Sequence, residues 1–220
     1  MKTLLIFPAQ WYPTQPYLST PYLTAFLQNK GWEVSQRDFN IESYDHFLSA
    51  PLLRHAEGLM RKQQQALKAQ NSLSIKEKSH LDVLSTGLKF SDRIIDGVGE
   101  AKAVMRTPER CFDFEAYQQA DMVIKSALKL VSDAYAPAIF SLSTFESGTR
   151  AEESTRKAHE TTRDIATNPF INLYEKNLLS TENWREYDEV WISIIWLLYT
   201  SDSAHEEDSV DLGGRRIIKK

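Results

Sequence analysis

The chain is short of cysteine and of long apolar runs, and each shortage excludes a class of protein. Its 220 residues include one cysteine, Cys111, which cannot form an intramolecular disulfide or a CxxC-type metal site. The longest apolar stretch, residues 190–198, is far shorter than the roughly 20 residues of a membrane span. Lys2 is the only basic residue before Pro8, so no signal peptide is predicted. We therefore expect a cytoplasmic protein that does not enter a membrane.

An excess of charge of one sign is also lacking. The chain has 26 Lys and Arg residues against 30 Asp and Glu residues, which gives a net charge of −4. This balance lacks the basic footprint of a nucleic-acid-binding protein, and we expect no nucleic-acid partner. Apolar residues make up 42% of the chain, which at this length is enough for the core of one large domain or two small ones.

The C-terminal residues differ in character from everything before them. Residues 196–220, WLLYTSDSAHEEDSVDLGGRRIIKK, resemble the translation of a sequencing-library adapter. The alternative is a genuine charged tail. We expect a non-native tail here and leave these residues out of the predicted fold, as one leaves out an expression scar.

The first 40 residues have the pattern of a strand, a helix and a second strand. Lys2–Phe7 (KTLLIF) is an almost continuous apolar run, which is typical of a central parallel strand buried on both faces. A helical pattern follows, with Thr20 as its predicted N-terminal cap and Gly31 as its stop. Trp32–Phe39 alternates in part and predicts the second strand. Together these elements predict a βαβ unit.

Helical patterns replace strands from residue 40 to about residue 183. Ser74 and Glu77 have the spacing of a capping box at the start of a long helix. An apolar stripe from Tyr117 to Ala134 is the clearest amphipathic pattern in the chain. Glu189–Ile195 (EVWISII) is apolar and β-branched, and it predicts another buried parallel strand.

These elements predict an α/β fold, an incomplete doubly wound parallel sheet with a large helical insertion. We expect residues 1–49 and 166–195 to form the α/β domain and residues 50–165 to form the mostly helical insertion. Parallel sheets have helices on both faces and usually more than three strands, so we expect the native sheet to continue downstream.

Motifs in the α/β part resemble a known family. An apolar strand, a Pro-rich loop, a P-x-L-x-x-L-like helix and a Gly-x-x-V turn follow one another over residues 4–34, and Asp38-Phe39-Asn40 ends the second strand. NPFINLYEKNLL and YDEVWISII match a later helix and strand, with Trp191 where glycine is usual. In this order the motifs resemble the N-terminal domain of cobalamin (B12)-binding radical SAM proteins, and the chain is similar to an N-terminal fragment of one.

The resemblance implies a Rossmann-like fold of the B12-binding type, which holds cobalamin outside the carboxyl ends of its strands. It also implies a downstream barrel that binds S-adenosylmethionine and a [4Fe–4S] cluster through CxxxCxxC, and a methyltransferase-type reaction. Because this chain has one cysteine, it cannot supply three thiolate ligands. We therefore expect a region that binds a corrinoid cofactor, has no catalytic residue of its own and works with a radical SAM domain in cis.

The resemblance places the cofactor-binding residues at the carboxyl edge of the sheet, in the loop after the first strand and at the ends of two other strands. Structural alternatives exist for these positions: the loop aromatics could seal the loop against the insertion, Asn40 could cap a helix, and Ser193 could be a small core residue. The predicted cofactor-binding residues are Pro8, Ala9, Gln10, Trp11, Tyr12, Ser19, Asp38, Asn40 and Ser193.

The histidines lack the spacing of a metal site. A lower axial imidazole for cobalamin would require D-x-H-x-x-G, whereas Asp45 and His46 are adjacent and no glycine follows. We expect cobalamin to bind without a protein imidazole, and we expect no protein metal site. The alternative function is a helical interaction or regulatory module on a small βαβ scaffold with no cofactor, because the helical middle is longer than the α/β part.

Overall fold

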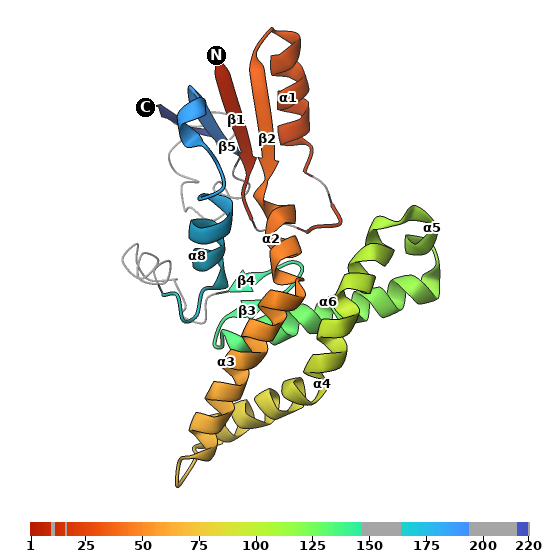
Figure 1. The fold of residues 1–220 in the computed structure, drawn as a ribbon, viewed down its shortest axis with the longest axis vertical. Helices are drawn as coiled ribbons and strands as arrows, with labels where there is room; N and C mark the ends of the chain where they lie inside the picture. The colour runs from red at the N-terminus through yellow and green to blue at the C-terminus, as the bar shows by residue number, and fades with distance from the viewer. Residues whose placement is uncertain (10–11, 16, 147–163, 194–214, 220) are drawn as a thin grey trace, which may run out of the picture. The chain divides into compact units, whose positions relative to one another are not determined.

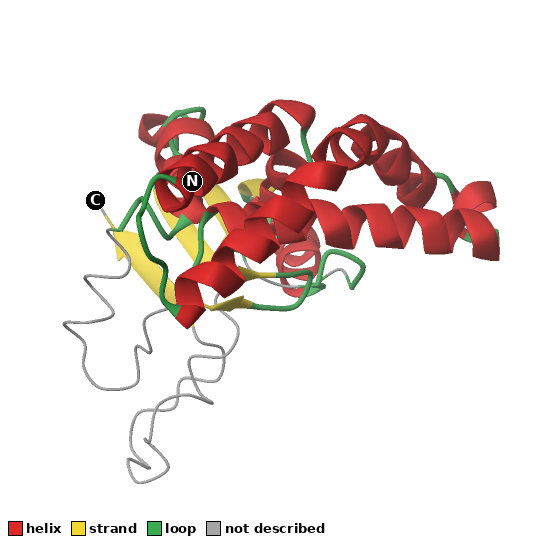
Figure 2. Ribbon diagram, turned by 90° about the horizontal axis from the view of Figure 1, so that it is seen from below, coloured by secondary structure: helices red, strands yellow, loops and turns green. Residues whose placement is uncertain are grey.

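The computed structural model describes residues 1–9, 12–15, 17–146, 164–193 and 215–219, the last range by its backbone alone. The chain forms two compact units. Residues 1–43 and 174–220 make up the sheet unit, and residues 44–173 make up the helical unit. Most of the described residues are helical (Figure 2). Among the described helices, none is both long and apolar enough to cross a membrane.

The sheet unit is built on three parallel strands (Figure 1). They are β1 (Lys2–Phe7), β2 (Glu33–Asp38) and β5 (Glu189–Ser193), and the strand order β2-β1-β5 places β1 in the centre. Residues 4–7 of β1 are each 3% exposed or less, because both faces of this strand are covered. The three predicted strands and their parallel arrangement are confirmed.

A fourth strand has no counterpart in the prediction. β6 (Arg215–Lys219) pairs antiparallel with the outer edge of β5, with Val190 opposite Ile218. It lies within the residues that we left out of the predicted fold. The described sheet therefore has four strands, of which three are parallel.

Helix α1 (Ser19–Asn29) covers one face of the sheet. Its Leu27 packs with Leu5 of β1 and Val34 of β2 in a small apolar core. Gly31 adopts φ +81°, a left-handed conformation that suits glycine, so the predicted stop of this helix is confirmed. The predicted Thr20 cap is wrong: the helix begins at Ser19 with Leu18 at the N-cap position, and Thr20 lies inside the first turn with its side chain buried.

The helical unit is a bundle of three long helices. Ser74 caps the second of them, which begins at Ile75, as predicted. Its Oγ accepts a hydrogen bond from the Glu77 N–H at 3.3 Å, and the Glu77 carboxylate accepts one from the Ser74 N–H at 2.8 Å. The predicted apolar stripe is the buried face of the third helix, although Tyr117 itself stays exposed. The three helices are α3 (Ala50–Lys68), α4 (Ile75–Arg106) and α6 (Phe114–Ala134).

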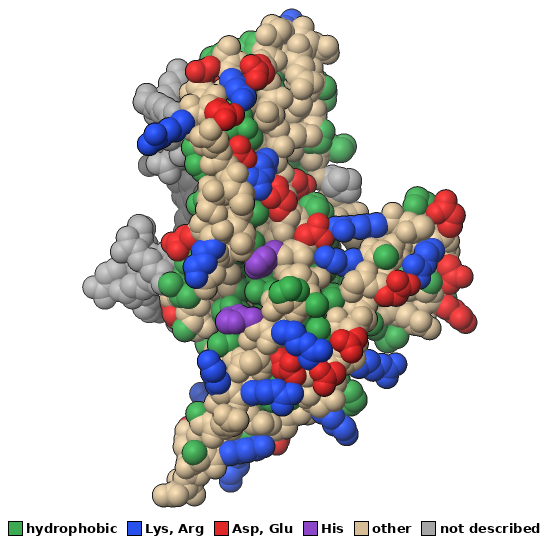
Figure 3. All heavy atoms as spheres, in the orientation of Figure 1, with side chains coloured by type: hydrophobic (Ala, Val, Ile, Leu, Met, Phe, Trp, Pro, Cys, Tyr) green, Lys and Arg blue, Asp and Glu red, His purple; other side chains and the backbone are tan. Residues whose placement is uncertain are grey.

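Polar contacts join α3 to α4, one at the surface of the bundle and one in its interior. The Arg54 guanidinium pairs with Asp96 at 3.3 Å, and the Ser91 hydroxyl donates to the buried Glu57 carboxylate at 2.8 Å. On the face drawn in Figure 3, acidic and basic side chains are intermixed over the described residues.

Shorter elements complete the helical unit and set its limits. Phe47 packs on Phe140 and Phe170, with ring centroids 4.8 and 4.9 Å apart. This aromatic cluster places Phe47, the last residue of the helix that follows β2, in the helical unit. The chain therefore divides at residues 43/44 and 173/174, whereas we expected 49/50 and 165/166. The shorter elements are α2 (Phe39–Phe47), α5 (Pro108–Cys111), β3 (Ile139–Phe140), β4 (Phe145–Glu146) and α8 (Pro169–Leu173).

Two glycines of α4 differ in what surrounds them, and this difference predicts opposite tolerance to a methyl group. A Cβ at Gly99 meets no described atom within 4 Å, so Gly99→Ala should raise the free energy of unfolding by about 1 kcal/mol through helix propensity. A Cβ at Gly87 would lie 2.7 Å from the terminal methyl of Met60, which would have to move. Gly87→Ala should therefore be the less stable variant of the two.

Urea unfolding followed by far-UV circular dichroism measures both variants, because the long helices dominate that signal. A Gly87→Ala protein at least as stable as Gly99→Ala would contradict the close packing of α3 and α4.

Candidate functional site

The order of the strands defines the most favourable ligand site of the sheet unit. From β1 the chain passes through α1 to β2 on one side, and it later returns to β5 on the other side of β1. The direction of winding therefore reverses between β1 and β5. In open α/β sheets, ligands bind in the crevice outside the carboxyl ends of the strands at such a reversal. The candidate site is this carboxyl edge, where β1 ends at Phe7 and β5 ends at Ser193.

Two predicted residues meet at this point. Ser193 is the last residue of β5, Ser19 is the first residue of α1, and their hydroxyl oxygens lie 3.0 Å apart in a hydrogen bond. Both side chains are half-buried. Because α1 begins at Ser19, beside the end of β5, the positive end of its helix dipole lies at the same edge, and its N-cap residue Leu18 makes no side-chain cap. The pair thus offers hydroxyl groups beside a helix N-terminus.

The loop after β1 is held on both sides of the sheet. The Ala9 N–H donates a hydrogen bond to the Tyr174 hydroxyl at 3.0 Å. The Phe7 ring stacks on Tyr17, which precedes α1, with centroids 4.8 Å apart. Tyr12 is 43% exposed. Pro8 is half-buried, and the predicted contacts of Gln10 and Trp11 fall outside the described residues.

The two predicted residues at the end of β2 have different roles. Asp38 lies beside Phe7 in the strand register, and its carboxylate accepts a hydrogen bond from the Ile41 N–H at 3.0 Å. It therefore caps α2, the role that we considered for Asn40, while burial raises the pKa of its carboxyl group. Asn40 lies inside the first turn of α2 and is only 2% exposed. The edge thus presents Asp38 two strands away from Ser193, roughly 10 Å at ordinary strand spacing.

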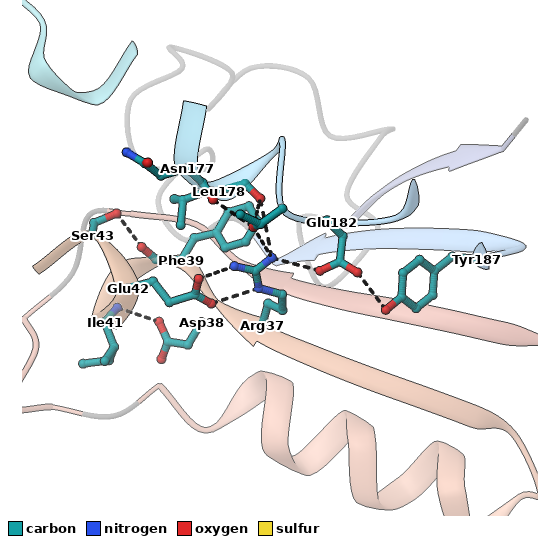
Figure 4. A network of polar contacts seen from close by, with 11 residues as sticks. Arg37, Asp38, Phe39, Ile41, Glu42, Ser43, Asn177, Leu178, Glu182 and Tyr187 are labelled. Atoms are coloured by element: carbon teal, nitrogen blue, oxygen red, sulfur yellow. Dashed lines mark hydrogen bonds and ion pairs between the residues drawn. The ribbon is translucent and has the colours of Figure 1, made fainter. Parts of the chain in front are cut away.

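An ion-pair cluster that we did not predict lies behind this edge. Val34 of β2 packs against α1, and side chains alternate along a strand. Arg37, three residues further along, therefore emerges on the sheet face opposite α1. Figure 4 shows its guanidinium between two carboxylates: Nε donates to Glu42 at 3.0 Å, and a terminal nitrogen donates to Glu182 at 2.9 Å. The same group lies 4.9 Å from the centre of the Phe39 ring.

The surrounding groups keep this cluster charged and ordered. The hydrogen bond to Glu42 is the main reason that the pKa of Arg37 is raised above its usual range, so the guanidinium is always a cation. The Tyr187 hydroxyl donates to the other side of Glu182 at 3.0 Å, and burial raises the pKa of Tyr187. The cluster, named here the Arg37 cluster, consists of Arg37, Phe39, Glu42, Glu182 and Tyr187.

The described residues contain no group of three or more His, Cys, Asp or Glu side chains that could hold a metal ion. Comparisons with protein-family models, with curated proteins and with solved structures found no match.

The Arg37 cluster predicts the stability of the sheet unit. Arg37→Met leaves the Glu42 and Glu182 carboxylates close together without their cation, and we expect the free energy of unfolding to fall by about 3 kcal/mol. Urea unfolding followed by tryptophan fluorescence measures this, because all five tryptophans belong to the sheet unit.

The double variant Arg37→Met/Glu182→Gln should recover part of the loss, because it also removes the more buried of the two carboxylates. Arg93→Met, at an exposed position of α4, is the matched control and should change stability little. Equal stability of the single and double variants would show that charge compensation is not what holds the cluster.

Proposed function

We propose that this chain is the cobalamin-binding N-terminal region of a radical SAM enzyme. The observation that carries the proposal is the reversal of winding between β1 and β5, with the Ser19–Ser193 hydroxyl pair directly at the carboxyl edge. The β1 loop, the adjacent helix N-terminus and the Asp38 carboxylate surround the same edge. These features lie where the family resemblance expects the cofactor-binding residues.

The residues at the edge suit the polar parts of cobalamin. Its corrin ring carries amide side chains, and hydroxyl groups such as those of Ser19 and Ser193 both donate and accept hydrogen bonds. Tyr17, which is half-buried and stacks on the buried Phe7 ring, and the exposed Tyr12 offer apolar surface for the ring itself.

The chemistry of the proposed enzyme is divided between two regions. Cobalamin, when bound, supplies a methyl group for transfer to a substrate. S-adenosylmethionine and the [4Fe–4S] cluster are assigned to a radical SAM domain in cis, because Cys111 is the single cysteine of this chain. The residues of the carboxyl edge then bind and orient the corrinoid.

A second candidate function is a helical interaction module. The turn between α5 and α6 exposes two phenylalanines, Phe112 at 90% and Phe114 at 72%. Exposed aromatic side chains close together on a surface are typical of protein-binding sites. The corrinoid proposal ranks first because it accounts for the carboxyl edge of the sheet, which the interaction module leaves unexplained.

Incubation of the purified chain with hydroxocobalamin, followed by desalting, tests the proposal. We expect the corrin absorbance to stay with the protein. In equilibrium dialysis, Ser19→Ala/Ser193→Ala should raise the Kd at least tenfold, since two hydrogen bonds of about 1 kcal/mol each are lost.

The control is Ser85→Ala/Ser143→Ala, which removes two exposed hydroxyls of the helical unit and should leave the Kd unchanged. A colourless protein after desalting would refute cobalamin binding and favour the interaction module. Equal effects of the two double variants would mean that cobalamin binds elsewhere.

A further inference from the structure

A single tyrosine connects the candidate site to the opposite face of the sheet. The Tyr174 hydroxyl accepts the Ala9 N–H at 3.0 Å, across 165 residues of sequence. Ala9 is the second residue after β1, at the start of the loop that enters the candidate site. The position of the backbone at Ala9 therefore depends on a residue outside the βαβ unit.

The Tyr174 ring is itself held in place. It contacts Phe39 of the Arg37 cluster edge to face, with centroids 5.8 Å apart. Tyr174 also begins a π-helical turn, Tyr174–Leu178, whose closing bond runs from the Leu179 N–H to the Tyr174 carbonyl at 2.8 Å. Single π-helical turns are rare and occur frequently at functional sites. Burial raises the pKa of the Tyr174 hydroxyl, which therefore stays neutral and keeps its hydrogen bond over the physiological pH range.

The attachment lies on the face of the sheet that α1 does not cover. Arg37, which emerges opposite α1, donates to the Leu178 carbonyl at 3.5 Å, and this places the π-helical turn on that face. On the α1 face, the Phe7–Tyr17 stack holds the strand end and the end of the same loop. The first loop residues are thus fixed from one face, and the last residues before α1 are fixed from the other.

We infer that Tyr174 is a positioning residue of the proposed cobalamin site, because it fixes the backbone at Ala9, directly after β1, before the corrinoid binds. The inference rests on the proposed function. A backbone segment that is already fixed loses less conformational freedom when a ligand binds. Loss of the Tyr174–Ala9 hydrogen bond should therefore weaken affinity more than it weakens the fold.

Tyr174→Phe removes the hydroxyl and keeps the ring. We expect the Kd for hydroxocobalamin to rise about three- to tenfold, the effect of one hydrogen bond. The amide of Ala9 should also exchange with solvent faster, while the amides of β1 keep their protection. Mass spectrometry after hydrogen–deuterium exchange measures this in the absence of any ligand.

Tyr44→Phe is the matched control. The Tyr44 hydroxyl donates to the Leu142 carbonyl at 2.8 Å within the helical unit, so this variant loses a comparable bond far along the chain from the β1 loop. The two variants should have similar melting temperatures, and Tyr44→Phe should bind hydroxocobalamin as the unaltered chain does.

The outcomes separate the two proposals. If the unaltered chain binds hydroxocobalamin and Tyr174→Phe binds it equally well, the positioning role is refuted and the proposed function stands. If both tyrosine variants weaken binding alike, Tyr174 is only structural and the positioning role is again refuted. If the unaltered chain stays colourless, the proposed function fails and the positioning role fails with it.

Discussion

The placement of the Arg37 guanidinium is the constraint on which the sheet unit depends. Arg37 extends from the edge strand β2, and its two carboxylate partners come from α2 and from the segment that leads to β5. A cation with so little exposure to water is stable only with its charge compensated, so the two segments of the unit must assemble together. The cluster thus stabilises the face of the sheet opposite α1, as the apolar packing of Leu27 stabilises the face that α1 covers.

The geometry of the candidate site depends on this arrangement. Phe39 stacks beneath the guanidinium and contacts the Tyr174 ring, and the Tyr174 hydroxyl holds the backbone at Ala9. A continuous chain of contacts therefore runs from the Arg37 cluster to the loop after β1. On the other face, the Ser19–Ser193 pair ties the start of α1 to the end of β5. The proposed corrinoid site is held by interactions from both faces, although few of the residues responsible lie in the loop itself.

Local patterns predicted the elements, and long-range contacts explain what they missed. The apolar run of β1, the capping box at Ser74 and the stripe of α6 are each decided by neighbouring residues, and the structure confirms them. The Thr20 cap failed because Thr20 is buried inside the first turn of α1, and tertiary burial outweighed a local preference. No local signal pairs Arg37 with Glu182 or Ala9 with Tyr174, since each pair is more than a hundred residues apart. The sequence therefore predicted the strand ends and named both serines as candidates, whereas the contact between the serines and the residues that hold the edge in place required the fold.

The division of the sheet unit into two sequence segments has a consequence for how the protein folds. The Lys2 backbone N–H bonds to the Asp188 carboxylate, 186 residues away, and β1 and β5 pair along the same long separation. Joining such distant strands is entropically costly and kinetically slow in a disordered chain. Residues 44–173 form a compact unit, and if this unit folds first, most of the disordered chain between the two strands is removed. We therefore expect the inserted helices to favour pairing of the parallel strands that they separate in sequence.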